Sequence, residues 1–124
     1  MPHTILEYTA TVADQPDFQA FWDQLHTFLV DAAPCRLQDI KSRAHRCDDF
    51  RMAGGQWEMA FVHLTIQLME GRDEATLAKV GQGALDLLKA HFPRTLAQRE
   101  ADFTVEIRPM RKDSYFKATT VKTP

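Results

Sequence analysis

The sequence predicts an α+β protein in which two β-α-β units form a four-stranded sheet with two helices on one face. Three observations predict this class. Apolar residues alternate along several short segments, as in half-buried strands, and recur every three or four residues along two longer segments, as in amphipathic helices. The order strand, helix, strand also occurs twice. Since strands joined through a crossover helix are usually parallel, we expect parallel pairing within each unit.

The first half of the chain supplies the first unit. Residues 4–10 include the β-formers Ile5, Tyr8 and Thr9 and no turn residues, and so predict a strand. A helix is expected to begin near Asp14 and Pro16, because an acidic cap followed by proline in the first turn is typical of helix starts. Its apolar stripe ends at Pro34. Residues 37–47 form a second extended segment that is rich in cations.

The second half repeats this order. A Gly-Gly turn signal at 52–56 predicts a short hairpin between the halves. Residues 57–68 form the clearest strand, with one apolar and one mixed face. Asp73 is the expected cap of a second helix that ends near Pro93. A last strand around 103–107 precedes a polar tail, so residues 1–124 form one domain with halves at about 1–48 and 57–110.

Two details of the second half indicate what its elements pack against. Gly81 and Gly83 lie inside the helix, where a glycine costs about 1 kcal/mol, so we expect this helix to pack closely on a sheet. Met59 and Phe61 lie on the mixed face of the clearest strand, which the helices do not cover. We therefore expect other copies of the chain to cover that face.

Composition excludes several classes of protein. The formal net charge of −2 argues against broad nucleic-acid binding, which requires a strongly basic domain. No apolar run approaches the length of a membrane span, and the N-terminus lacks the basic and then apolar pattern of a secretory signal. Two cysteines, Cys35 and Cys47, do not make a disulfide framework, so we expect a reduced, cytoplasmic setting.

Other kinds of site find little support in the sequence. His45, Cys47 and His63 do not have the tight spacing of metal ligands, so no metal site is predicted. His63 on a central strand is expected to be a hydrogen-bonded structural histidine, and the two cysteines to be small buried thiols. No glycine-rich phosphate loop or Ser-His-Asp order is present.

Proline at the second position is the main candidate for catalysis. If Met1 is removed, Pro2 carries a free secondary amine at the chain terminus. A free α-amino group titrates near pH 8, and burial or neighbouring cations lower its pKa, so the amine can act as a general base near neutral pH. Many chains begin Met-Pro without any catalytic role, so this signal needs support from elsewhere.

Cations of two segments are candidates for anion binding. Lys41, Arg43 and His45 share one face of the extended segment, because side chains alternate along a strand. The alternative is a solvated basic strand. Arg72 lies between a strand end and a helix start, where backbone amides and the helix dipole favour anions, and its guanidinium can hold a carboxylate through two hydrogen bonds. The alternative there is an exposed arginine beside a helix cap.

Several short runs, collinear over nearly the whole chain, resemble the 5-carboxymethyl-2-hydroxymuconate Δ-isomerase family of the tautomerase superfamily. They are Met1-Pro2-His3, residues 40–45 (IKSRAH), 52–56 (MAGGQ) and 60–65 (AFVHLT), Gly71-Arg72, residues 89–92 (KAHF), Glu106-Ile107 and Phe116-Lys117. No single run is specific, but their order and spacing together are. One position departs from the family: Lys41 stands where the family usually has arginine.

The resemblance implies a homotrimer of double β-α-β subunits that needs no cofactor. It implies that Pro2 is the base and that Arg72, Lys41 and Arg43 bind a small polycarboxylate substrate. The implied reaction moves a proton in a carboxylated 2-hydroxydiene during breakdown of homoprotocatechuate. Because lysine lacks the planar fork of arginine, Lys41 puts the substrate preference in question.

Two alternatives remain open at this stage. One is a related tautomerase with a different enol or dienol substrate. The other is a binding module without enzymatic activity on the same fold, which retention of Met1 would favour.

Overall fold

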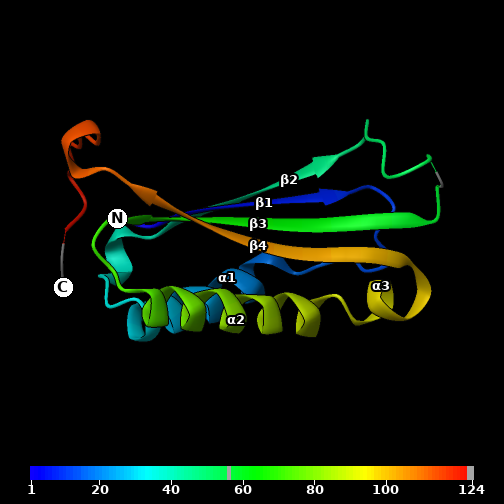
Figure 1. Ribbon diagram of the computed structural model, residues 1–124, viewed down its shortest axis with the longest axis horizontal. Helices are drawn as coiled ribbons and strands as arrows, with labels where there is room; N and C mark the ends of the chain where they lie inside the picture. The colour runs from blue at the N-terminus through cyan, green and yellow to red at the C-terminus, as the bar shows by residue number, and fades with distance from the viewer. Residues whose placement is uncertain (56, 123–124) are drawn as a thin grey trace.

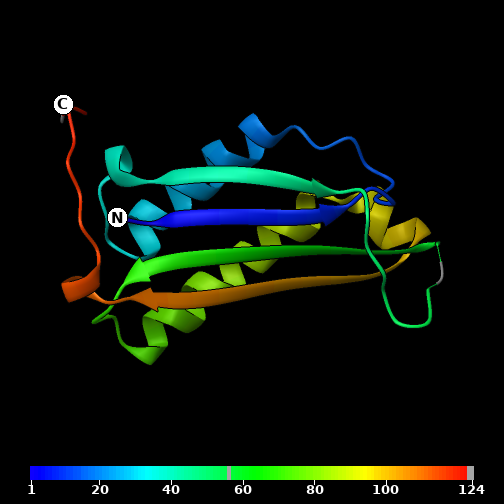
Figure 2. The ribbon, with the colours of Figure 1, turned by 90° about the horizontal axis from the view of Figure 1, so that it is seen from above.

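In the computed structural model, which describes residues 1–55 and 57–122, one sheet lies over two long helices (Figures 1 and 2). The four strands have the spatial order β2-β1-β3-β4. β1 is parallel to β2 and β3 is parallel to β4, while β1 and β3 run antiparallel at the centre. The α+β class, the two β-α-β units and the parallel pairing within each are therefore confirmed. The strands are β1 (His3–Thr9), β2 (Lys41–Cys47), β3 (Met59–Met69) and β4 (Glu100–Met110).

The helices α1 (Phe18–Ala32) and α2 (Glu74–His91) both lie on one face of the sheet, as predicted (Figure 1). Asp73 caps α2 by accepting a hydrogen bond from the Thr76 amide at 2.8 Å, as expected. The expected start of α1 was too early, because Asp17 is its cap. Asp14 instead accepts from the Arg94 and Thr95 amides in the second half of the chain.

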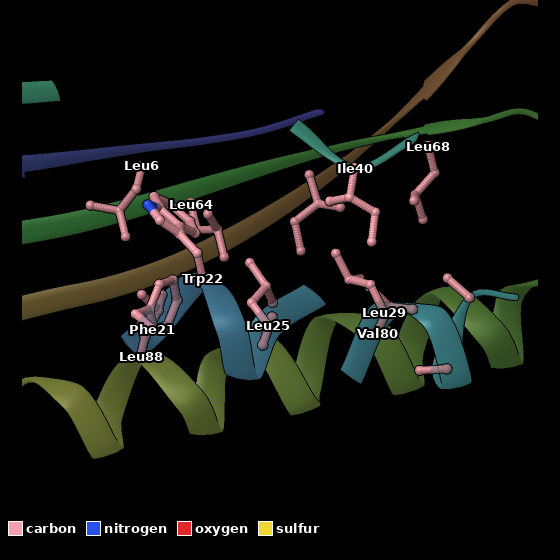
Figure 3. Packing of buried hydrophobic residues seen from close by; sticks show 14 of the residues in the cluster. Leu6, Phe21, Trp22, Leu25, Leu29, Ile40, Leu64, Leu68, Val80 and Leu88 are labelled. Carbon is pink, nitrogen blue, oxygen red and sulfur yellow. The ribbon is translucent and has the colours of Figure 1, made fainter. Parts of the chain in front are cut away.

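The core lies between the helices and the sheet (Figure 3). Every second residue of β3 points toward the helices and is fully buried, because side chains alternate along a strand. Burial of each large apolar side chain contributes roughly 1.5–3 kcal/mol, which makes this layer the main source of stability. The largest members of the core include Leu6, Phe21, Leu25, Leu29, Leu64, Leu68, Val80 and Leu88.

The two glycines of α2 allow two different close approaches. Gly81 lies against β4, since a Cβ there would be 3.5 Å from Ile107 Cδ1. A Cβ at Gly83 would instead overlap the ring of Phe28 on α1. The prediction of close packing on the sheet thus describes Gly81, whereas Gly83 serves the contact between the two helices.

The connection between the halves is not a hairpin, so this prediction was wrong. β1 lies between β2 and β3 in the sheet, and the connecting segment must cross its end (Figure 2). A tight turn does occur at the predicted glycines, where the Gly55 amide donates to the Met52 carbonyl at 2.9 Å. Gly55 has φ of +95°, which glycine adopts without strain. Gln56, the last residue of the predicted turn, is outside the described residues.

Three short helices and the course of the tail differ from expectation. The extended segment at 37–47 begins with a 3-10 turn, η1 (Leu37–Asp39), before β2. A short helix, α3 (Pro93–Gln98), follows α2, because Pro93 ends one helix and is well suited to the first turn of the next. After β4 the polar tail forms η2 (Lys112–Ser114) and runs across the end of the sheet at which β1 begins (Figures 1 and 2).

The sheet face opposite the helices, here called the open face, is uncovered in the single chain (Figure 1). Along the two central strands it carries Ile5, Phe61, His63 and Thr65, of which only Thr65 is buried. The described residues include no helix that is long and apolar enough to cross a membrane.

Candidate active site at the N-terminus

Pro2 is buried at the point where β1 and β2, the two strands of the first β-α-β unit, begin. Its carbonyl accepts a hydrogen bond from the Lys41 amide at 3.0 Å, and the next residue, His3, is in register with Lys41. The parallel pairing of β1 with β2 therefore brings the N-terminus to the first cation of β2. Two of the predicted site residues, Pro2 and Lys41, come together for this reason.

The surroundings of the terminal amine perturb its titration. Burial lowers the pKa of the Met1 amino group below its ordinary value, while the negative charge of Asp39 acts in the opposite direction. The positive charges of Arg72 and Lys41 lower the same pKa further. Arg72 thus joins Pro2 and Lys41 within electrostatic range of the terminus. Burial raises the pKa of the nearby Cys35 thiol, which donates weakly to the Leu29 carbonyl and stays neutral.

Asp39 at the end of η1 organises the cations beside the terminus. Lys41 Nζ donates to the Asp39 carbonyl oxygen at 2.8 Å, and Lys117 Nζ donates to its carboxylate at 2.9 Å. Lys117 Nζ also lies 3.2 Å from Met1 Sδ. The hydrogen bond and charge of Lys117 hold the pKa of the Asp39 carboxyl below its ordinary value. No role is predicted from the sequence for Asp39 or Lys117, although Phe116-Lys117 is one of the runs that resemble the family.

Arg72 is held by backbone carbonyls. Its Nε and Nη2 donate to the Ala33 carbonyl at 3.1 and 2.8 Å, Nη2 also donates to the Pro34 carbonyl at 3.3 Å, and Nη1 donates to the Met69 carbonyl at 2.9 Å. The guanidinium therefore connects the loop after α1 to the end of β3. One of its five N–H groups is left for another acceptor by this arrangement. Arg72 bears on the site through its charge and through the position of this loop.

Arg43 lies next to the terminus on the open face. Both of its terminal nitrogens donate to His3 Nδ1, at 3.2 and 3.1 Å. Because a guanidinium only donates, His3 is neutral with its proton on Nε2, which donates to the Tyr115 hydroxyl at 2.9 Å. Burial lowers the pKa of His3, and the charges of Arg43 and Lys41 lower it further. A second residue of the tail, Tyr115, thus also reaches the site.

The other candidate groups lie apart from this site. His63 Nδ1 is 2.6 Å from Thr104 Oγ1, which agrees with its expected role as a hydrogen-bonded structural histidine. Within residues 1–55 and 57–122, no three His, Cys, Asp or Glu side chains are grouped to hold a metal ion.

Two hollows of about 520 and 290 Å³ lie beyond the opposite end of β1. The larger is lined by Tyr8 and Arg46 among others, and the smaller by Phe50 and Trp57 among others. Neither is lined by Pro2 or by the cations around it.

Two parallel β-α-β units joined antiparallel into one four-stranded sheet have the topology of the tautomerase fold. This fold is shared with solved structures of low identity, such as a fused 4-OT symmetric trimer with a TM-score of 0.72 and 13% identity, which covers 96% of this chain and 94% of that one. Residues 2–123 match the family described as 5-carboxymethyl-2-hydroxymuconate isomerase. The chain belongs to this family and is an isomerase.

Two relatives illustrate the similarity. The 5-carboxymethyl-2-hydroxymuconate Delta-isomerase of Escherichia coli is 28% identical over 121 residues, which are 98% of this chain and 96% of that protein. The crystal structure of a 5-carboxymethyl-2-hydroxymuconate isomerase from Deinococcus radiodurans R1 has a TM-score of 0.88 at 27% identity. That match covers 96% of this chain and 90% of the other.

Proposed function

We propose that this isomerase moves a proton in 5-carboxymethyl-2-hydroxymuconate, or in a similar carboxylated 2-hydroxydiene, in the breakdown of homoprotocatechuate. The amine of Pro2, freed by removal of Met1, is the general base and acid. The observation that carries the proposal is the burial of Pro2 beside Lys41 at the start of β2, where burial and the charges of Arg72 and Lys41 lower the pKa of the amine that precedes it. While Met1 is attached, the Pro2 nitrogen is an amide and has no basic lone pair.

The reaction needs a base of moderate strength and fixed positive charge. The unprotonated Pro2 amine takes a proton from the enol oxygen or an activated carbon of the substrate, which leaves a dienolate. The charge of this dienolate spreads toward the adjacent carboxylate, where cations stabilise it. The protonated amine then returns the proton to another carbon, and the chain ends the cycle unchanged. No cofactor takes part in either transfer.

Lys41 and Arg43 are proposed to bind substrate carboxylates. Both are positively charged and lie on β2, the strand paired with the N-terminal strand β1. For Arg72 we propose a carboxylate contact through its remaining N–H group. The bonds of this guanidinium to the Ala33 and Met69 carbonyls fix its position. Lysine at position 41 offers a single point charge in place of a fork, so a related enol or dienol substrate is the alternative within the same reaction class.

We further propose a homotrimer. The open face carries Ile5 and Phe61, and fold relatives include proteins described as symmetric trimers. Covering this face with other copies buries apolar surface that a single chain leaves in water. The N-terminal site borders the same face, since Arg43 and His3 lie on it, so neighbouring copies would also enclose the substrate.

The test combines a mass measurement with a substitution. Intact mass of the active protein should lack Met1, and Pro2→Ala should lower kcat by about 10²–10⁴-fold, the usual contribution of a general base, with the fold intact. Near-normal turnover of Pro2→Ala, or retention of Met1 on all active protein, would exclude Pro2 as the base. Retained Met1 would favour a binding module on this fold.

A further inference from the structure

We propose that Lys117, in the tail after β4, binds a carboxylate of the substrate at the position that the Met1 side chain now fills, and that Asp39 is the positioning residue that holds it there. This inference rests on the proposed function, because it requires removal of Met1. It adds to the site a residue from the C-terminal tail of the same chain.

The contacts of Lys117 Nζ carry the first step. The ammonium donates to Asp39 Oδ1 at 2.9 Å and to Met1 Sδ at 3.2 Å. A thioether sulfur is a weak acceptor, and an ammonium has three donors to satisfy. Removal of Met1 therefore takes one acceptor away and leaves a donor of Lys117 directed at the space beside the Pro2 nitrogen. A carboxylate oxygen in that space would be a stronger acceptor than the sulfur it replaces.

The anchoring of the tail carries the second step. Glu70 Oε2 accepts from the Lys112 amide at 2.6 Å at the start of the tail, and the Tyr115 hydroxyl bonds His3 at 2.9 Å farther along. Both contacts lie on the N-terminal side of Lys117 in sequence, so they set the path by which the tail reaches the terminus (Figures 1 and 2). The side chain of Lys117 is 24% exposed and that of Asp39 is 15% exposed, so neighbouring groups cover much of both side chains although Lys117 as a whole residue is exposed.

The balance of charge gives the third step. The carboxylate of Asp39 is shared between Lys117 at 2.9 Å and Arg36 at 3.7 Å, while Lys41 Nζ bonds only the Asp39 carbonyl oxygen. Two cations thus pair with one carboxylate, and a third, Lys41, binds the carbonyl oxygen of the same residue. Fixed positive charge in excess beside the terminus favours a substrate with more than one carboxylate, with Lys41 and Lys117 as two separate points of attachment.

The experiment compares two substrates in the mature protein. Lys117→Gln should lower kcat/KM for 5-carboxymethyl-2-hydroxymuconate by about 10–100-fold, the usual cost of a lost charged hydrogen bond, mainly through KM. The same variant should change kcat/KM less than about threefold for 2-hydroxypenta-2,4-dienoate, which has a single carboxylate and less need of a second attachment point. Lys117→Met should behave like Lys117→Gln, and Lys117→Arg should restore part of the loss because it keeps the charge.

Controls separate binding from folding and from the proposed base. Lys122→Gln removes an exposed lysine of the same tail and should keep wild-type kinetics. Asp39→Asn should raise KM for the polycarboxylate while leaving Tm close to that of Lys117→Gln. An unchanged kcat/KM of Lys117→Gln with the polycarboxylate, or an equal loss for both substrates, would overturn the inference. If Pro2→Ala is inactive in the same assay, that outcome removes Lys117 alone and leaves the proposed function intact.

Discussion

Arg72 and Ala33 form a two-point contact: Nε and Nη2 of the guanidinium donate to one carbonyl oxygen at 3.1 and 2.8 Å. Ala33 is fully buried and caps the end of α1, while Arg72 lies just before the cap of α2. The contact therefore ties the end of one helix to the start of the other. It also fixes the loop that leads into η1, where Asp39 and the cations of the site begin.

This contact predicts a structural cost for loss of Arg72. Arg72→Ala should lower the free energy of unfolding by about 2–4 kcal/mol, because buried carbonyls lose charged donors. Arg72→Lys should recover only part of this, since one ammonium cannot reproduce the fork. Denaturant unfolding measures both, with Arg111→Ala as a control because that arginine is exposed. A variant Arg72→Ala with wild-type stability but much lower kcat/KM would show that substrate binding is the main role of this arginine.

The acid limb of the pH profile should report the terminal amine. Burial, together with Arg72 and Lys41, lowers the pKa of the Met1 amino group. We expect the same surroundings to act on the Pro2 amine, so that its base form persists to lower pH than for a free terminus. Lys41→Gln removes a positive charge and should move the acid limb of kcat/KM to higher pH. Asp39→Asn removes the opposing negative charge and should move it to lower pH. Lys41→Arg keeps the charge and is the matched control.

The account would be contradicted if the acid limb moved in the same direction in Lys41→Gln and in Asp39→Asn, because these two substitutions change the local charge with opposite sign. Lack of movement in either variant would indicate that the titrating group lies elsewhere.

The sequence carried enough information for the fold because each element has a period of its own. The alternation of Val62, Leu64 and Ile66 and the helical spacing of Phe21, Leu25 and Leu29 both depend on local backbone geometry. These patterns are visible without knowing what each element packs against. The hairpin prediction failed because the Gly54–Gly55 signal reports a turn and says nothing of which strand lies beside the next.

The site was predictable only in part. Pro2 and Lys41 lie where β1 and β2 begin, and Arg72 follows the end of β3. These three positions lie at the same end of the sheet, which is why the residues come together. Asp39 and Lys117 were missed because their pairing joins residues 78 positions apart through a tail with no periodicity. The carbonyl partners of Arg72 were equally hidden, because any residue type supplies a carbonyl.

The two glycines of α2 should respond differently to the same change. Gly81→Ala fits at van der Waals distance from Ile107 and should raise the free energy of unfolding by about 0.5–1 kcal/mol through helix propensity. Gly83→Ala gains the same propensity but forces the Phe28 ring to move, so it should be neutral or destabilising. Thermal unfolding of the two single variants measures the contrast. Equal stabilisation by both would mean that Phe28 moves aside freely.

His3 should make stability depend on pH in a defined window. Because burial and the charges of Arg43 and Lys41 depress its pKa in the folded state, the unfolded chain binds the proton more readily. The contribution of neutral His3 to the free energy of unfolding is complete above the unfolded pKa of about 6.5 and is lost as the pH falls through the folded pKa. His3→Gln should flatten the fall in the free energy of unfolding below pH 6.5. His26, whose pKa burial also lowers, should account for part of the remaining slope.

The open face should set the oligomeric state. Ile5 lies on that face between Arg43 of β2 and Thr65 of β3, so Ile5→Lys puts a charge in the centre of the proposed trimer contact and next to another cation. Sedimentation at micromolar concentration should give a trimer for the wild type and smaller species for Ile5→Lys. Lys79→Glu, on the exposed side of α2, is the matched control and should remain trimeric. A wild-type monomer at this concentration would leave the open face without its proposed cover, and a trimeric Ile5→Lys would mean that the copies meet elsewhere.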